Sequence, residues 1–182
     1  MVKRMFVAID LPEDVRVGLV GLDPHLRGLR WLGASQLHLT LSFLGEVAAQ
    51  PEQRLIAALA EIRGPRFRLV LQGLGSFSRN RQPAVVWAGV ECAGPDLLRL
   101  QRRVCDAGLA AGLAAETKPY HPHVTVGRCK GLDAAALRPW LERHAQSDFG
   151  TFEVTGFTLY SSILHLDGPE YNCVFRQDLE RV

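Results

Sequence analysis

Two copies of a short pattern, His-x-Thr-x, are the residues of this chain best suited to chemistry: His38-Leu39-Thr40-Leu41 and His123-Val124-Thr125-Val126. Successive side chains of a strand point to opposite faces, so the His and the Thr of each copy share one face and the aliphatic residues share the other. An imidazole gives or takes a proton near neutral pH, and a hydroxyl donates hydrogen bonds to anionic oxygens. Two such strands around one cleft would supply a general acid, a general base and two hydroxyl donors, a set suited to displacement at phosphorus without a metal.

The pairing of the two copies is more informative than either copy alone. A single His-x-Thr is common by chance, and a lone histidine on a strand is more often structural than catalytic. Both copies, however, lie in runs that alternate apolar and polar residues. The first run interleaves two sets: Leu37, Leu39, Leu41 and Phe43 with His38, Thr40 and Ser42. The two histidines are 85 residues apart, at positions 38 and 123 of 182, which indicates an internal repeat.

The hydrophobic pattern predicts the same order of elements in both halves. In the first half we expect a strand at 4–11, a helix at 12–29, the His38 strand ending at Gly45, a helix at 51–62 and a strand at 66–74. In the second half we expect a strand at 84–90, a helix at 94–113, the His123 strand, a helix at 133–144 and strands at 152–160 and 171–178. The simplest explanation is two similar lobes related by a pseudo-twofold axis, with the motif strands facing each other across a cleft.

Composition sets broad limits on the class of protein. The chain has 47% hydrophobic and 22% charged residues, which is ordinary for a soluble globular protein of one domain or two small lobes. No apolar stretch approaches the roughly 20 residues that span a bilayer, and the first residues do not resemble a signal peptide. We therefore expect a cytoplasmic protein without membrane partners. The four scattered cysteines, for which we expect the reduced state, are Cys92, Cys105, Cys129 and Cys173.

Arginine dominates the basic residues, with 18 Arg and three Lys and a formal net charge of +2. Arginine suits bidentate phosphate contacts and stacking on bases, although most of these residues are expected to be solvated surface. The net charge is too small to favour binding of a long duplex. A phosphate-bearing end or a short single strand fits better.

Two other groups of residues allow a functional interpretation, and each also has an ordinary structural one. His121 and His123 would share a face if a strand runs through Pro122, and with His38 they could hold a metal, but no carboxylate or cysteine lies at ligand spacing beside them. The segment 76–81 (SFSRNR) could clasp an RNA strand through its aromatic ring and two arginines, or could equally be a hairpin connection. Gly73 and Gly75 do not form a dinucleotide fingerprint.

Seven segments along the whole chain carry a resemblance to a known family. They are RMFVAI at 4–9, HLTLSFLGEV at 38–47, LGSF at 74–77, VVWAGV at 85–90, PHVTVGR at 122–128, LYSS at 159–162 and GPEY at 168–171. The chain resembles the two-histidine phosphoesterase superfamily and, within it, the RNA 2′,3′-cyclic phosphodiesterases, also called 2′-5′ RNA ligases. His121 is the one departure from the pattern, outside the motif positions.

The resemblance implies an α+β fold in which residues 1–182 form a single bilobal RNA 2′,3′-cyclic phosphodiesterase domain, with two antiparallel sheets flanking a central cleft and helices outside. It implies hydrolysis of 2′,3′-cyclic phosphate RNA ends to 2′-phosphates with no cofactor. His38 and His123 would be the catalytic pair, with His38 favoured as acid and His123 as base. Thr40 and Thr125 would bind the phosphate oxygens, and Arg128 would be a neighbour of the phosphate.

Several interpretations stay open at this point. The same acid and base could run the reverse reaction, joining a cyclic phosphate to a 5′-hydroxyl with a 2′-5′ linkage. The cleft could also act on a small-molecule cyclic phosphodiester, or recognise RNA ends without turnover. We expect a monomer that binds RNA ends or short single-stranded RNA with a 2′,3′-cyclic phosphate. Phe6 and Tyr171 could line the cleft, although a place in the core is the simpler expectation.

Overall fold

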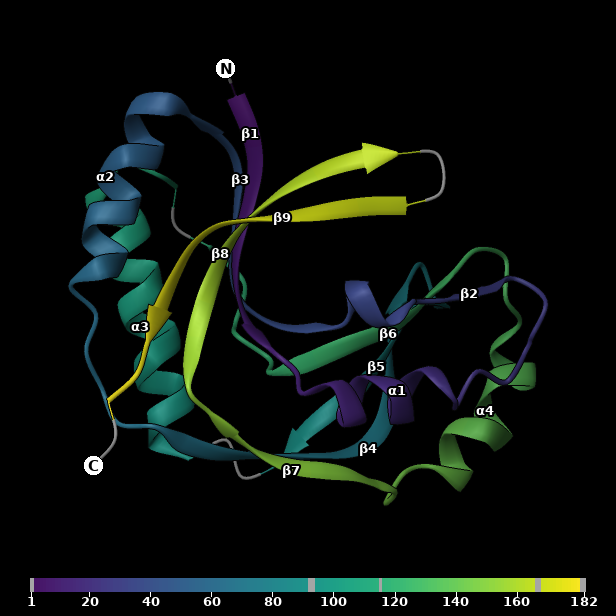
Figure 1. Cartoon of the computed structure of the whole chain (residues 1–182). Helices are drawn as coiled ribbons and strands as arrows, with labels where there is room; N and C mark the ends of the chain where they lie inside the picture. Colours follow the sequence, from purple (N-terminus) through teal and green to yellow (C-terminus); the bar gives the residue numbers. More distant parts are fainter. Residues whose placement is uncertain (1, 92–93, 115, 166–167, 181–182) are drawn as a thin grey trace.

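A computed structural model describes residues 2–91, 94–114, 116–165 and 168–180 and shows an α+β fold built on one curled antiparallel sheet (Figure 1). The strands are β1 (Val2–Asp10), β2 (Leu29–Trp31), β3 (His38–Ala48), β4 (Phe67–Arg79), β5 (Gln82–Glu91), β6 (His123–Cys129), β7 (Asp148–Val154), β8 (Gly156–His165) and β9 (Gly168–Asp178). The helices are α1 (Glu13–Val20), α2 (Ala49–Ala60), α3 (Pro95–Ala110) and α4 (Ala134–Arg143), and a 3₁₀ turn, η1, covers Ala34–Gln36. Within the described ranges, no helix is long and apolar enough to cross a membrane.

The sheet consists of two four-stranded halves that meet at the motif strands. Its order is β7-β4-β5-β6-β3-β1-β8-β9, with β2 added beside β6. The halves are joined by a single register pair, Leu39 with Val124, between β3 and β6. We call β9-β8-β1-β3 with α2 and α3 the first lobe, and β6-β5-β4-β7 with β2, α1 and α4 the second lobe. The expected two sheets are therefore the two halves of one hydrogen-bonded sheet.

The sequence halves do not coincide with the lobes, although the expected repeat of elements is present. β4 comes before the midpoint of the chain but pairs with β5 and β7 in the second lobe, and β8 pairs with β1 in the first lobe. The helices are exchanged in the same way, because α3 packs on β3 while α1 packs against β7. Each half of the chain thus contributes strands to both sides of the cleft.

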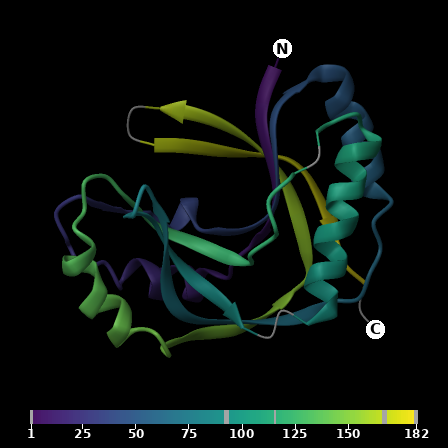
Figure 2. The same cartoon turned by 180° about the vertical axis from the view of Figure 1, so that it is seen from behind.

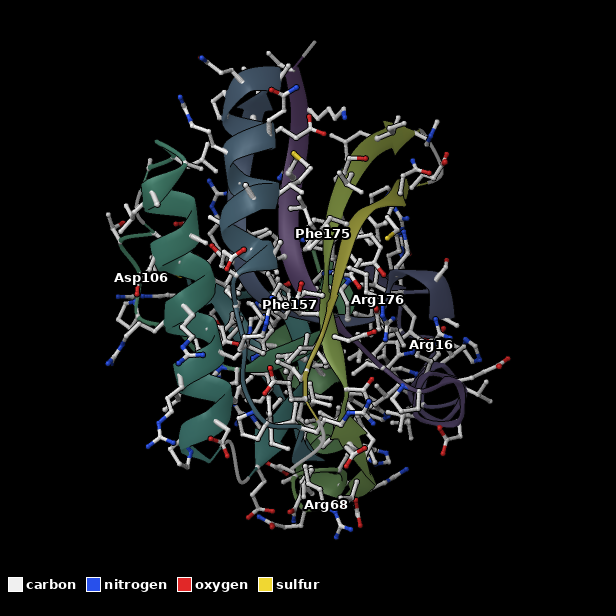
Figure 3. The ribbon with its side chains drawn as sticks, turned by 60° about the vertical axis from the view of Figure 1, so that its left-hand side comes forward. Arg16, Arg68, Asp106, Phe157, Phe175 and Arg176 are labelled. Carbon is white, nitrogen blue, oxygen red and sulfur yellow. The ribbon has the colours of Figure 1, made fainter. Side chains whose placement is uncertain are left out.

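The helices lie on the outer faces of the curled sheet and leave its inner face free (Figures 1 and 2). α2 and α3 pack side by side over the first lobe. In the second lobe the Trp31 ring contacts Trp140 of α4 edge-on and donates its indole N–H to the Leu19 carbonyl of α1 at 3.0 Å. Figure 3 shows Asp106 on the outer side of α3, with Phe157 between the helices and the sheet and Arg176 on the sheet's other side. One continuous apolar core runs beneath both lobes.

Two boundaries differ from the expectation. The first helix ends at Val20 instead of continuing to 29, because Asp23-Pro24 disfavours helix, and His25 and Gly28 have positive φ angles. The strand expected at 152–160 is two strands, since the chain leaves the second lobe after Val154 and enters the first at Gly156. A Cβ at position 156 would lie 2.5 Å from the Gln177 carbonyl oxygen, so the crossing requires glycine.

Candidate active site

The two His-x-Thr motifs lie on β3 and β6, the adjacent strands at the centre of the sheet. As the alternation predicts, Leu39, Leu41, Val124 and Val126 are fully buried under the helices. The four motif side chains, His38, Thr40, His123 and Thr125, are partly exposed on the inner face. The pairing of Leu39 with Val124 places the two motifs side by side.

A β-bulge follows the threonine in each motif strand and changes which residues reach the inner face. In β3 the register with β1 moves from Ala8–Thr40 to Val7–Ser42, so Leu41 is the extra residue. A bulge interrupts strict alternation. Ser42 is consequently buried, and Phe43 is 57% exposed on the cleft side. The expectation that Phe43 belongs to the buried face and Ser42 to the polar face was wrong for this reason.

The bulge in β6 brings Arg128 into the site. Thr125 pairs with Trp87, but the next pair is Val86 with Gly127, which leaves Val126 as the extra residue. In a regular strand Arg128 would point away from Thr125, because the two are an odd number of residues apart. With the bulge both side chains line the same cavity.

Two adjoining cavities form the cleft. The first, of about 340 Å³, is lined by His38, Thr40, Thr125 and Arg128, together with Arg4, Phe6 and Tyr171. The second, of about 480 Å³, is lined by His123, Phe77 and Tyr120. Thr40 and Phe43 line both cavities, so they form the boundary between them. The structure therefore gathers all five residues expected from the sequence around one cleft.

The His38 ring is enclosed by aromatic side chains of the first lobe. Phe6 stacks on it with ring centroids 4.7 Å apart, and the edge of Tyr171 approaches at 5.2 Å. Burial lowers the pKa of His38 to about 4; a hydrogen bond with the Gln36 backbone and the negative charge of Asp10 oppose this shift, while Arg128 and His123 add to it. At neutral pH the free protein thus holds His38 as the neutral imidazole.

The second motif histidine, His123, has a fixed orientation. Its Nδ1 lies 2.6 Å from the His121 carbonyl oxygen, which can only accept a hydrogen bond. Nδ1 therefore carries the proton, and in the neutral ring Nε2 carries the free lone pair. Phe77 packs edge-on against the ring with centroids 4.9 Å apart. Burial lowers the pKa of His123, with the His121 backbone bond opposing and the His121 ring reinforcing the shift.

The structure supports a place for Phe6 and Tyr171 in the cleft, but it gives no support to the possible metal site. Phe6 is buried and also lines the first cavity with Tyr171, so core and cleft roles coincide for Phe6. Within the described ranges, His, Cys, Asp and Glu side chains form no group of three that could hold a metal, so the set of His38, His121 and His123 gains no support. Cys105, Cys129 and Cys173 are free thiols, and Cys92 lies outside the described residues.

Two residues that shape the site, Tyr120 and Asp10, were not identified from the sequence. The Tyr120 hydroxyl donates to the Thr40 carbonyl at 3.0 Å, which ties the 116–122 segment to β3. Asp10 accepts hydrogen bonds from Tyr160 at 2.6 Å and from Thr158 at 2.8 Å. The only signal in the sequence for the Asp10 contacts is that this carboxylate follows the apolar run at 5–9.

Comparison with known proteins places this architecture in a family. The model of the 2′-5′ RNA ligase superfamily matches residues 20–164. The RNA 2′,3′-cyclic phosphodiesterase of Thermus thermophilus is 37% identical over 92% of this chain and 86% of its own, and that of Escherichia coli is 33% identical over 88% and 87%. The crystal structure of E. coli LigT complexed with 3′-AMP superposes with a TM-score of 0.83 at 30% identity, covering all of both chains. The chain belongs to the 2′-5′ RNA ligase superfamily.

Proposed function

We propose that this protein hydrolyses 2′,3′-cyclic phosphates at RNA ends to 2′-phosphates, with His38 and His123 as the catalytic pair. The observation that carries the proposal is that the two imidazoles, two threonines and Arg128 line one divided cleft at the junction of the two lobes. Two relatives are named RNA 2′,3′-cyclic phosphodiesterase, and E. coli LigT has been crystallised with 3′-AMP and with phosphate. These names support a nucleotide phosphate as the group that the cleft receives.

The proposed reaction is a displacement at phosphorus by water. His123 Nε2 takes a proton from the attacking water as the new P–O bond forms, because Nδ1 is already bound to the His121 carbonyl. The P–O3′ bond breaks, and His38 donates a proton to the leaving 3′ oxygen, so that the product is a 2′-phosphate. Thr40, Thr125 and Arg128 donate hydrogen bonds to the phosphate oxygens as negative charge develops on them.

The protonation of His38 depends on the substrate. In the free protein its pKa is about 4, whereas a general acid must carry a proton. An anionic phosphate bound beside the ring favours the charged imidazolium and raises its pKa. Binding of the cyclic phosphate therefore prepares His38 for its role.

We propose further that the whole chain acts as one bilobal domain and as a monomer. The joined sheet, the shared core and the contribution of both motifs from a single chain support this arrangement. An RNA-end substrate also fits the cytoplasmic location expected from the sequence.

The deciding experiment is product analysis with RNA that carries a 2′,3′-cyclic phosphate. Phosphorus NMR should show a 2′-phosphate, formed in the presence of excess EDTA. His38→Gln and His123→Gln should each lower turnover by about a hundredfold or more, because a positioned acid or base contributes about 10²–10⁴-fold. The control is His25→Gln, since His25 is exposed and away from the cleft. A 3′-phosphate product, or full activity in either motif variant, would contradict the assignment.

A further inference from the structure

The β4–β5 hairpin has an unusual turn at its tip. Arg79 and Gln82 form the last pair, and the two turn residues, Asn80 and Arg81, have φ angles of 51° and 65°. Two-residue hairpin turns with positive φ at both positions strongly favour Asn-Gly, because glycine has no Cβ to clash. Asn80 meets this preference, but Arg81 occupies the position of the glycine. Residues held in a costly backbone conformation are concentrated at functional sites.

The tip is connected directly to the catalytic cleft. Phe77 of β4 packs against the His123 ring at 4.9 Å and against Trp87 at 5.4 Å. Arg79 is two residues farther along β4, and the bulge in this part of the hairpin falls in β5, so Arg79 shares the face of Phe77. The β4–β5 and β8–β9 hairpins project toward the same side of the molecule (Figures 1 and 2).

A row of paired residues links the hairpin to Arg128. Phe77 pairs with Val85, and Val85 pairs with Arg128, which lines the first cavity. Arg79 lies one row farther out on the same face. Arg128, at the phosphate end of the cleft, and Arg79, near the hairpin tip, thus lie on the same face of the sheet.

Among the described residues, no carboxylate neutralises the two hairpin arginines. Both are exposed, and neither has an ion pair in the part of the chain that the structure describes. Ion pairs join other arginines to nearby acids: Arg63 to Glu180, Arg66 to Glu153 and Arg99 to Asp96. The tip of the hairpin therefore presents two available guanidinium groups.

We propose that the β4–β5 hairpin binds the backbone phosphates of the RNA strand that precedes the cyclic-phosphate end, through Arg79 and Arg81. This inference rests on the proposed function, since the cleft must hold the terminal nucleotide. Guanidinium groups form bidentate hydrogen bonds with phosphates and carry no base preference through such contacts. The hairpin would make the protein favour oligonucleotides over cyclic mononucleotides without selecting a sequence.

The main test compares two substrates with one double variant, Arg79→Gln with Arg81→Gln. For an RNA octamer with a 2′,3′-cyclic phosphate, kcat/KM should fall about tenfold or more, because two charge-assisted contacts are lost. For a 2′,3′-cyclic mononucleotide it should stay within about twofold. The salt dependence of octamer binding should become less steep by about 1.4 in log–log slope, at about 0.7 for each lost phosphate contact.

A matched control separates this effect from loss of charge in general. Arg68→Gln with Arg102→Gln removes two exposed arginines, the first at the opposite end of β4 (labelled in Figure 3) and the second on α3. This control should leave both substrates unchanged. An equal loss on octamer and mononucleotide in the hairpin variant would indicate that the hairpin only supports His123 through Phe77, and the proposal would fall. No loss on either substrate would overturn it as well.

Single variants at position 81 separate charge from turn geometry. Arg81→Gly supplies the residue that the turn prefers, so its Tm should equal or exceed that of the parent, while its octamer KM should rise. Arg81→Lys keeps the positive charge and should retain most of the octamer affinity. If Arg81→Gly binds the octamer as well as the parent does, Arg81 has no role in RNA binding.

Binding measurements keep this inference distinct from the proposed function. Fluorescence anisotropy with a labelled octamer that carries a 3′-phosphate requires no turnover. If the parent protein turns over no cyclic phosphate but binds this RNA through Arg79 and Arg81, the proposed function fails and the hairpin site stands. If it hydrolyses cyclic phosphates and the double variant binds RNA like the parent, the hairpin proposal alone fails.

Discussion

At the scale of single residues, the environments of the two histidines decide the chemistry. The sequence predicted two imidazoles that titrate near their ordinary value of about 6.5. In the structure, burial lowers both pKa values in the free protein, and that of His38 to about 4. The residue types were predictable from the motifs, whereas their titration depends on Phe6, Tyr171 and Phe77, which arrive from distant parts of the chain.

The lowered pKa values predict different pH profiles for kcat/KM and kcat. The profile of kcat/KM reports the free enzyme, so both limbs should lie below about 6.5, and the rate should fall as rising pH deprotonates the acid. The profile of kcat reports the complex, in which the phosphate raises the pKa of His38. We expect the optimum of kcat to lie at higher pH than that of kcat/KM. Steady-state kinetics from pH 4 to 9 checks this, and superimposable profiles centred at 6.5 would contradict it.

Arg128 should influence both the phosphate and the acid. Its positive charge lowers the pKa of His38, so Arg128→Gln should raise this pKa and move the limb of the kcat/KM profile that His38 sets to higher pH. The same change removes a donor to the phosphate and should raise KM and lower kcat/KM by about tenfold or more. Arg128→Lys keeps the charge and should leave the limb in place. A limb that stays fixed in Arg128→Gln would separate Arg128 electrostatically from His38.

At the scale of elements, the β-bulges mark the limit of what the sequence predicted. Alternation correctly placed His38, Thr40, His123 and Thr125 on one face, because the bulge in each strand comes only after the threonine. Beyond the bulges alternation failed: Phe43 and Arg128 reach the cleft only because one extra residue lies between them and the threonine. A bulge depends on pairing with the neighbouring strand, which a single-strand pattern does not contain.

The β4–β5 pairing predicts a strong effect at Gly75. A Cβ at this position would lie 2.3 Å from the Trp87 ring, so Gly75→Ala must displace the tryptophan that contacts Phe77. We expect a loss of about 1–3 kcal/mol in the free energy of unfolding, measured by urea titration, together with reduced turnover. Gly18→Ala is the control. Nothing lies within 4 Å of its new Cβ in α1, and alanine should stabilise the helix by up to about 1 kcal/mol. Equal stability of the two variants would show that the Trp87 ring moves freely.

At the scale of the whole molecule, the exchange of strands and helices makes the lobes interdependent. The sequence indicated the repeat but assigned 66–74 to the first lobe and merged β7 with β8, since hydrophobic periodicity does not record which strand pairs with which. The chain passes between the lobes several times, and the core is continuous beneath both. Each lobe therefore contains strands and helices whose ends are held in place by segments of the other lobe.

This arrangement predicts that a cavity in one lobe unfolds both lobes together. All three tryptophans, Trp31, Trp87 and Trp140, belong to the second lobe, so tryptophan fluorescence reports that lobe alone. Leu159→Ala creates a cavity in β8 of the first lobe, where the side chain is fully buried, and should cost about 2–5 kcal/mol. If the lobes are one cooperative unit, the urea midpoint from tryptophan fluorescence should fall by the same amount as the midpoint from far-UV circular dichroism. Leu137→Ala in α4 is the control, because it places the cavity in the lobe that the tryptophans report. A fluorescence midpoint that Leu159→Ala leaves in place, with a biphasic circular dichroism transition, would mean that the joint at Leu39 and Val124 is too weak to couple the lobes.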